Sequence, residues 1–317
     1  MTDGERIKNW AREIGFDKVG LAPAGPTPGG EHLTEWLTRG YHGGMDWMKK
    51  NADRRLDPRR VLPEARSIIS VALNYYTPHE RQPGELKISR YAWGTDYHYV
   101  LGRMLEELVA RIARGWPASA NLWYVDTGPV LEKAWAEQAG IGWIGKNGVL
   151  ISRDFGTWLF LGEIITTLQL KPDLPQSNHC GTCTSCIDVC PAGAIVEPYV
   201  VDTHRCISFW TIEHRGEFPP GIADRLDGWI FGCDVCQDVC PFNRFQKNAK
   251  LREDFAPRRE LLRPGRWLEI SEDDFADLTR KSPLQRTRLE GIKRNLQAAG
   301  IMAVTANRPV RQKKLEK

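Results

Sequence analysis

The stretch HCGTCTSCIDVCPAGAI, residues 179–195, decides one part of the fold. It contains the pattern C-x2-C-x2-C-x3-C-P, the spacing with which bacterial ferredoxins hold iron–sulfur clusters. Three thiolates of such a run wrap one four-iron cluster, and the fourth points to a second cluster. The run therefore predicts a module that moves electrons one at a time.

A second and shorter run, GCDVCQDVCPFN at residues 232–243, lacks one cysteine of this pattern, and Cys206 can supply the missing thiolate. All eight cysteines lie between Cys180 and Cys240, so two four-cysteine sites are complete with none left over. The crossed ferredoxin arrangement assigns one cluster to Cys180, Cys183, Cys186 and Cys240, and the other to Cys190, Cys206, Cys233 and Cys236.

Structural zinc sites and disulfides are the alternatives for these cysteines. Zinc sites usually lack the four-cysteine run before proline, and disulfides are rare in reducing compartments. The N-terminus, MTDGERIKNW, is charged and lacks the apolar centre of a signal peptide. No apolar run approaches the about 20 residues that span a bilayer. We therefore expect a cytoplasmic protein without a membrane segment.

Upstream of the cysteines, helical and strand patterns alternate, which predicts an α+β fold with a layered sheet. A length of 317 residues suggests two or three modules. We expect a layered α/β domain in residues 1–170, a bacterial-ferredoxin-like module in residues 171–245 and a helical, basic segment in residues 246–317. The expected elements are a helix closed by Gly15, strands at 18–22, 66–73 and 121–125, a polar loop at 77–95, and helices at 97–114 and 129–139.

Several blocks in this order together resemble one family. They are RRLDPRRVLPEARSII (54–69), RYAWGTDYH (90–98), YVDTGPVLEKAWAEQAGIGWIGKN (124–147), HRCISFWT (204–211) and the two cysteine runs. Over most of residues 1–245 the chain resembles the epoxyqueuosine reductases. The resemblance implies an oxidoreductase that uses cobalamin, reduced through two [4Fe-4S] clusters, to convert epoxyqueuosine to queuosine at the wobble position of tRNA. It also implies that residues 1–170 form the cobalamin-binding domain.

The resemblance places Asp126 at the cobalamin as proton donor to the oxygen that leaves the epoxide. The pKa of Asp126 should then be raised by burial against the corrin and apolar walls. On local sequence alone, Asp126 would instead cap a helix that starts at Pro129. We expect Glu132 and Glu137, inside that helix, to be exposed or to pair with Lys133.

Further cobalamin contacts follow from the same resemblance. Arg55 could pair with a propionamide or with the nucleotide phosphate, and Ser208 would lie between a cluster and the corrin. His98 is expected to be an ordinary helix-start histidine or part of the corrin surroundings, because the family binds cobalamin without a histidine ligand. The full set of implied contacts is Arg55, Ser89, Asp126, Leu150, Leu161, Ser208, Cys233 and Asp234.

Partners are indicated by charge and by the resemblance. Residues 281–317 hold ten basic and two acidic residues, which suits a polyanion such as tRNA or describes a solvated tail. Arg215 falls where a family residue touches tRNA, and Trp210 could stack on a splayed base or simply cover a cluster. The stretch LQRTRLEGIKRNLQAAGIMAV (284–304) resembles the start of a HEAT-like repeat, so we expect a truncated repeat packed on the cluster module. We also expect an external low-potential electron donor and a monomer.

Two other functions remain open. The cysteines alone permit a non-catalytic, ferredoxin-type electron carrier, although the domain of about 170 residues before them argues against it. A cobalamin and iron–sulfur reductase of a small organic substrate is the other, and the basic tail argues against that.

Overall fold

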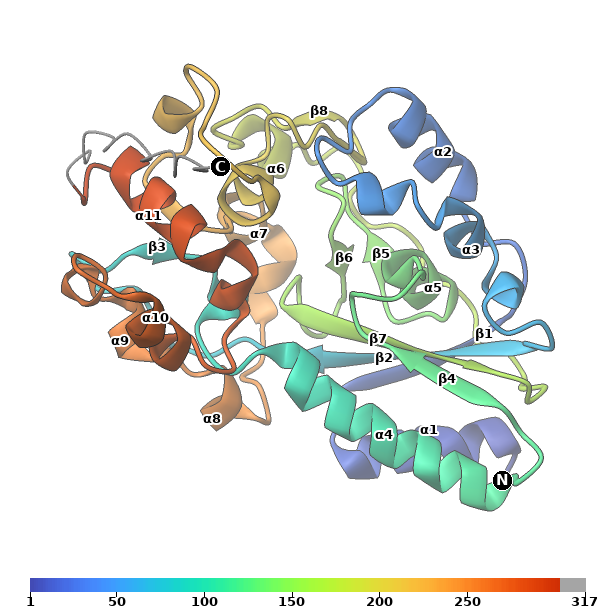
Figure 1. Ribbon diagram of the computed structural model, residues 1–317. Coiled ribbons are helices and arrows are strands. Elements are labelled where there is room, and N and C mark those ends of the chain that lie inside the picture. Colours follow the sequence, from blue (N-terminus) through green and yellow to red (C-terminus); the bar gives the residue numbers. More distant parts are fainter. Residues whose placement is uncertain (303–317) are drawn as a thin grey trace, which may run out of the picture.

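A computed structural model describes residues 1–302, apart from the side chain of Phe245. An antiparallel sheet organises the first half of the chain, with strand order β1-β2-β7-β4 (Figure 1). Its two central strands are apolar and β-branched, and every residue of β2 is buried. The strands are β1 (Lys18–Pro23), β2 (Ser67–Asn74), β4 (Asn121–Tyr124) and β7 (Leu159–Thr166).

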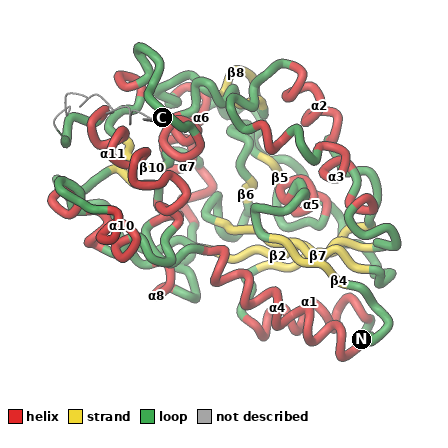
Figure 2. Tube along the Cα trace, viewed as in Figure 1, coloured by secondary structure: helices red, strands yellow, loops and turns green. Residues whose placement is uncertain are grey.

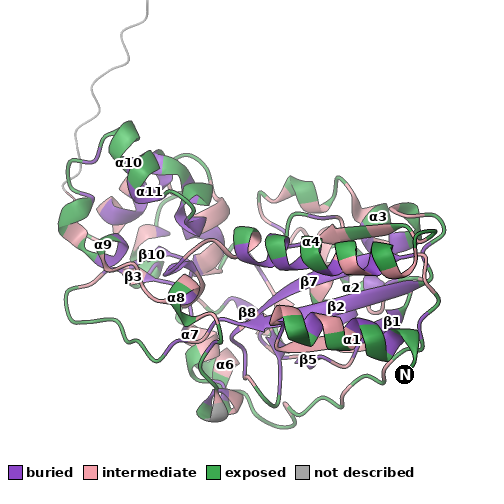
Figure 3. Ribbon diagram, turned by 90° about the horizontal axis from the view of Figure 1, so that it is seen from below, coloured by how far each residue is buried: buried purple, intermediate pink, exposed green. Residues whose placement is uncertain are grey.

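Helices cover both faces of this sheet. α1 (Asp3–Ile14) and α4 (Tyr97–Gly115) lie together on one face, and α5 (Glu132–Gln138) lies on the other (Figure 1). Apolar residues recur at three- and four-residue spacing along α4, and they join the largest core cluster. The buried sheet between its helices is visible as the purple layer in Figure 3. The α+β character predicted from the sequence is therefore confirmed.

The predicted elements of this half agree closely with the observed ones. α1 ends at Gly15, whose φ of 119° gives the left-handed stop that glycine favours. The strands and the long helix α4 begin within a residue of their expected positions. The exception is the helix expected from Pro129, because α5 begins only at Glu132. The smaller elements of this half are α2 (Gly30–Thr38), α3 (Ala52–Leu56), β5 (Trp143–Ile144) and β6 (Leu150–Ile151).

The second half has little regular structure, and loops dominate it in Figure 2. Its short elements are α6 (Ser185–Asp188), β8 (Ile195–Glu197), β9 (Val200–Val201), the π-helical turn η4 (Phe209–Glu213), β10 (Trp229–Phe231), α7 (Val235–Asp238), α8 (Arg252–Phe255), α9 (Arg259–Leu262), α10 (Glu272–Leu278) and α11 (Arg288–Ala298). The HEAT-like stretch contributes one helix, α11, which packs against β10 and η4. Residues 303–317, with much of the predicted basic tail, lie outside the described residues.

One strand connects the two halves in a way that the sequence did not indicate. β3 (Lys87–Ile88) pairs in parallel with β10. Leu86, Ile88 and Trp93 are consequently buried in the core that α9, α10 and α11 form. The expected loop at 77–95 therefore contains a strand that docks in the C-terminal half. The boundaries at residues 170 and 245 stay predictions. No helix within residues 1–302 is long and apolar enough to cross a membrane.

Candidate cofactor and active site

The eight cysteines gather in two sets around the short helices α6 and α7. The thiol of Cys240 lies within electrostatic reach of those of Cys180, Cys183 and Cys186, and the thiol of Cys236 lies within reach of those of Cys190, Cys206 and Cys233. These are the two sets that the crossed arrangement predicts. Their role as ligands stays a prediction.

Within residues 1–302, no group of three or more His, Cys, Asp or Glu side chains is arranged to hold a single metal ion.

A loop of the sheet half holds both cysteine turns in place. Lys146 Nζ donates to the carbonyl oxygens of Gly181 at 2.7 Å and of Cys183 at 2.9 Å. The neighbouring Asn147 is buried, and its Nδ2 donates to the carbonyl oxygen of Cys236 at 3.3 Å. Residues of the block that contains Asp126 are thereby tied to both cysteine sets.

Asp126 sits in a strained turn directly after β4. Its φ of 57° is the left-handed conformation, which a non-glycine residue adopts only when its surroundings enforce it. Its backbone N–H donates to Glu132 Oε1 at 2.6 Å, and its Oδ2 lies 3.5 Å from His98 Nε2. Asp126 does not cap α5, which begins at Glu132 after the uncapped Leu131.

His98 is more than a helix-start histidine. Asp96 caps α4, and its Oδ1 lies 2.7 Å from His98 Nδ1, so His98 bridges Asp96 and Asp126. Burial would lower the pKa of His98, but the close carboxylate of Asp126 and the hydrogen bond to Asp96 raise it to about 9. At neutral pH the imidazole therefore carries a proton.

In the protein without a corrin, the pKa of Asp126 is lowered, and the rise expected from burial against the corrin stays a prediction. Burial pushes the pKa of Asp126 upward, but the hydrogen bond and charge of His98, together with Arg286 and Arg55, lower it below the usual range. Asp126 is therefore a carboxylate beside an imidazolium. The charge of its histidine neighbour, which the local sequence does not show, is the reason.

The glutamates of α5 also differ from expectation. Glu132 is partly buried and accepts the Asp126 N–H, while Lys133 Nζ donates to Gly148 O at 2.6 Å. Glu137 accepts the backbone N–H of Ile144 at 2.8 Å. The two glutamates therefore hold neighbouring loops, and their expected pairing with Lys133 is wrong.

The carboxylate of Asp126 is accessible to solvent. Its side chain is 59% exposed, and the neighbouring Lys133 on α5 is exposed as well. Desolvation by nearby protein pushes the pKa of Asp126 upward and lowers that of Lys133. A substrate can therefore reach Asp126 from the solvent side.

The residues expected at cobalamin fit this position unevenly. Leu150 and Leu161 belong to one buried cluster with Val130, next to the Asp126 turn. Arg55 is buried, and its Nη1 donates to Gly128 O at 3.0 Å, so it braces the turn. Its Nε is buried without a partner within residues 1–302. The expected pairing of Arg55 with a propionamide or a phosphate stays a prediction.

The remaining expected contacts lie beside the second cysteine set. Ser89 Oγ donates to Asp234 Oδ1, and the Arg90 N–H donates to Asp234 Oδ2 at 2.6 Å. Burial raises the pKa of Asp234 to about 6. Ser208 is partly buried, and its hydrogen-bonding groups lie beside the thiol of Cys206, where they lower the pKa of that thiol. Ser89, Ser208, Cys233 and Asp234 therefore form a polar group next to one cysteine set.

The residues expected to contact RNA are placed differently from each other. Arg215 is exposed, and its guanidinium donates to Ile212 O at 2.7 Å and Arg286 O at 2.8 Å. Trp210 is buried with Cys206 and Cys233, and its Nε1 donates to His204 O at 2.8 Å. Trp210 packs beside two cysteines and also lines a hollow, so both of its suggested roles stay predictions.

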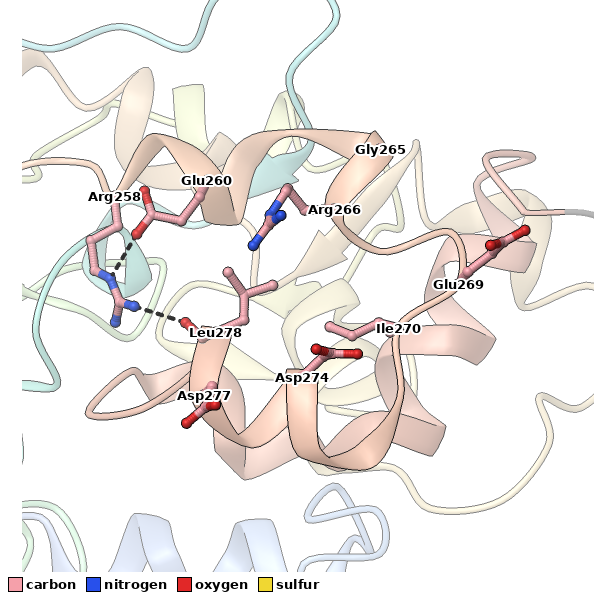
Figure 4. A pocket seen from close by; sticks show the side chains of 9 residues that line it. All are labelled: Arg258, Glu260, Gly265, Arg266, Glu269, Ile270, Asp274, Asp277 and Leu278. Carbon is pink, nitrogen blue, oxygen red and sulfur yellow. Dashed lines mark hydrogen bonds and ion pairs between the residues drawn. The ribbon is translucent and has the colours of Figure 1, made fainter.

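Two hollows elsewhere are separate from the Asp126 turn. One, of about 300 Å³, is lined by Phe209, Trp210 and Arg215 among others. The other, of about 580 Å³, lies among α9, α10 and the segment between them (Figure 4). Acidic and basic side chains line it. The guanidinium of Arg258 donates hydrogen bonds to Glu260 Oε1 and to the carbonyl oxygen of Leu278. None of the expected site residues lines this larger hollow.

The fold and site define an iron–sulfur oxidoreductase in which a double-cluster module is tied to an α+β domain. Residues 179–243 match the family model described as "4Fe-4S double cluster binding domain", and residues 55–127 match the one described as "Epoxyqueuosine reductase QueG, DUF1730".

Individual proteins agree with these family models. An epoxyqueuosine reductase of Synechocystis sp. is 49% identical over 88% of this chain and 99% of its own length. The structure of epoxyqueuosine reductase from Streptococcus thermophilus has a TM-score of 0.86 and 31% identity, over 94% of this chain and 81% of that one. A crystal structure of epoxyqueuosine reductase with an epoxyqueuosine-modified tRNA stem loop has a TM-score of 0.81 and 29% identity, over 93% and 81%. The chain belongs to the epoxyqueuosine reductase family.

Proposed function

We propose that this protein reduces epoxyqueuosine to queuosine at the wobble position of tRNA. The observation that carries the proposal is the Asp126 turn, where a solvent-accessible carboxylate and an imidazolium meet in a member of this family. In this reaction two carbon–oxygen bonds break and an alkene forms. Two electrons and two protons are taken up, and the oxygen leaves as water.

Cobalamin, when bound, supplies a low-potential cobalt centre that can act on the epoxide carbons. Leu150 and Leu161 would give its apolar wall, and Ser89, Ser208, Cys233 and Asp234 its polar edge. Arg55 supports the turn beside it. Two [4Fe-4S] clusters on the eight cysteines would deliver electrons from an external low-potential donor.

The proton for the leaving oxygen comes from the pair of Asp126 and His98. Asp126 is the more exposed group and faces the substrate, while His98 stores the proton at neutral pH. When substrate and corrin exclude water, the ionised Asp126 is destabilised and takes the proton from His98. Asp126 then passes it to the oxygen as the bond to carbon breaks.

Binding of tRNA is part of the same proposal. Arg215 is exposed and lines the hollow of about 300 Å³, where a phosphate of the tRNA could be held. This electrostatic attraction would weaken as the salt concentration rises. The proposal also keeps the cobalamin-binding role of residues 1–170, the truncated HEAT-like segment, the cytoplasmic location and the monomeric state.

The test uses anaerobic protein loaded with cobalamin and a strong reductant, and offers tRNA that carries epoxyqueuosine. Queuosine formation is the expected result, and tRNA without the modification is the control. Absence of queuosine, despite bound cobalamin and full iron content, would contradict the proposal.

A further inference from the structure

Two neighbouring carboxyl groups, one partly buried and one fully buried, lie next to the Asp126 turn, and the proposed reaction uses neither. Glu132 is the first residue of α5, and Glu163 lies on the central strand β7, where it is fully buried opposite Tyr124. The two carboxyl groups are close enough for each to affect the pKa of the other. Buried acids of this kind are rare without a compensating partner.

The contacts of the pair indicate where a proton is held. Glu132 Oε1 accepts the Asp126 N–H, so this group acts as an acceptor. Glu163 Oε1 accepts the hydroxyl of Ser70 at 3.4 Å, and its Oε2 is buried with no donor within residues 1–302. Burial raises the pKa of both groups. Two ionised carboxylates side by side would repel each other, and a proton on Glu163 removes that repulsion.

Other charged and titratable groups face Glu132 without replacing this proton. His98 and Arg55 direct their donors to Asp126, Asp96 and the backbone of the turn, and Lys133 donates to Gly148 O. The groups that act electrostatically on Glu132, or on which it acts, are Arg55, Tyr97, His98, Asp126, Lys133 and Glu163. The carboxyl group of Glu163 is therefore the partner for the Glu132 oxygen that does not accept the Asp126 N–H.

The Asp126 turn requires such support. A left-handed aspartate costs free energy, and it persists only where its surroundings determine it from several sides. Arg55 holds the following carbonyl oxygen of Gly128, and Glu132 holds the N–H of Asp126 itself. Without Glu132, nothing else described in the chain accepts that N–H.

We propose that Glu132 and Glu163 share one proton and that Glu132 is a positioning residue, which holds Asp126 with its carboxylate toward His98. The shared proton and the hold on the turn are properties of the protein itself. Only the effect on turnover rests on the proposed function.

Infrared spectroscopy tests the shared proton directly. At pH 7 the wild-type protein should show the carbonyl stretch of a protonated, buried carboxyl group, and Glu163→Gln should lose it. Glu106→Gln, a change at an exposed glutamate of α4, should keep it. Absence of this band from the wild type, or its persistence in Glu163→Gln, would overturn the shared proton.

Hydrogen–deuterium exchange tests the hold on the turn. A peptide that covers residues 125–131 should exchange about tenfold faster in Glu132→Ala, because the acceptor of the Asp126 N–H is lost. Glu132→Gln retains an acceptor oxygen and should exchange like wild type. Glu106→Ala is the matched control. Unchanged exchange in Glu132→Ala would overturn the positioning role, and if that variant does not fold, faster exchange in folded Glu132→Gln would overturn it instead.

Kinetics on epoxyqueuosine-containing tRNA then separate positioning from a merely structural role. Glu132→Ala should lower kcat about 100-fold with KM within about twofold, since a displaced Asp126 affects chemistry more than binding. Glu132→Gln should restore most of kcat. Equal kcat in wild type and Glu132→Ala would overturn the role. If the wild type itself is inactive, the proposed function fails, while the infrared and exchange results still decide this inference.

Discussion

The sheet half and the cysteine half of this molecule are built on different principles. In the sheet half, a four-stranded sheet and long helices bury a large apolar core. Between residues 179 and 243, no described helix or strand exceeds five residues. Apolar burial stabilises the sheet half, whereas metal ligation is expected to supply part of the folding free energy of residues 179–243. The strained Asp126 turn lies in the sheet half, where a large apolar core offsets the cost of the strain.

The largest expected effect comes from removing one thiol of the cysteine half. Cys240→Ala should lose a cluster, so that iron falls from about eight to about four atoms per chain. Turnover should fall to background, because electrons no longer reach the active site. Iron analysis and limited proteolysis check this result, and the sheet half should stay resistant. Full iron content in the variant would remove Cys240 from the ligand set.

The next effect concerns the sheet half and leaves the clusters intact. Asp126→Asn should lower kcat by about 10²- to 10⁴-fold, the usual contribution of a general acid. Asparagine tolerates the left-handed conformation, so the turn should persist and the iron content should stay unchanged. Anaerobic turnover and iron analysis on the same sample check this prediction. Full turnover would show that Asp126 is not the proton donor.

A smaller effect is expected from pH. The pKa of His98 is raised to about 9, so kcat should fall as pH rises through about 9, approaching tenfold for each further unit. The stabilisation that His98 gives the folded state is fully present below its unfolded pKa of about 6.5, and it is lost as pH rises through about 9. A pH–rate profile of wild type and His98→Gln checks the first statement, and chemical unfolding at several pH values checks the second. An identical alkaline limb in both proteins would show that His98 does not hold the proton.

The smallest effect lies far from both sites. Thr2 and Glu5 form a capping box at the start of α1. Thr2→Ala should lower the free energy of unfolding of the sheet half by about 1 kcal/mol, because the Glu5 N–H loses its acceptor. Turnover and iron content should not change. A change in iron content would show that the stability of α1 affects the cysteine sites.

The sequence was most informative where a pattern is local. Apolar periodicity was sufficient for β2 and α4, and cysteine spacing was sufficient to group the thiols into two sets. The pairing of β3 with β10 was missed because a two-residue strand inside a polar loop has little periodicity. The alternation of Leu86 and Ile88 before the buried Trp93 was the available indication.

The active-site electrostatics were less predictable for a physical reason. The pKa of Asp126 depends on His98, which lies 28 positions earlier and meets it only in the folded chain. The neighbours of Glu132 along its helix predict exposure or pairing with Lys133, whereas its carboxyl group interacts with Asp126 and with Glu163 on β7. A single glutamate within the apolar strand LFLGEIIT (159–166) was the one local indication of a buried acid.

The most direct test of the account is a single turnover with stored electrons. Protein with both clusters reduced and cobalamin bound is freed of reductant and mixed anaerobically with epoxyqueuosine-containing tRNA. One queuosine should form for every two electrons lost from the protein, and Asp126→Asn with equal iron and cobalamin should form it about 10²- to 10⁴-fold more slowly. Oxidation of the clusters without queuosine in the wild type, or an equal rate of product formation in Asp126→Asn, would contradict this mechanism.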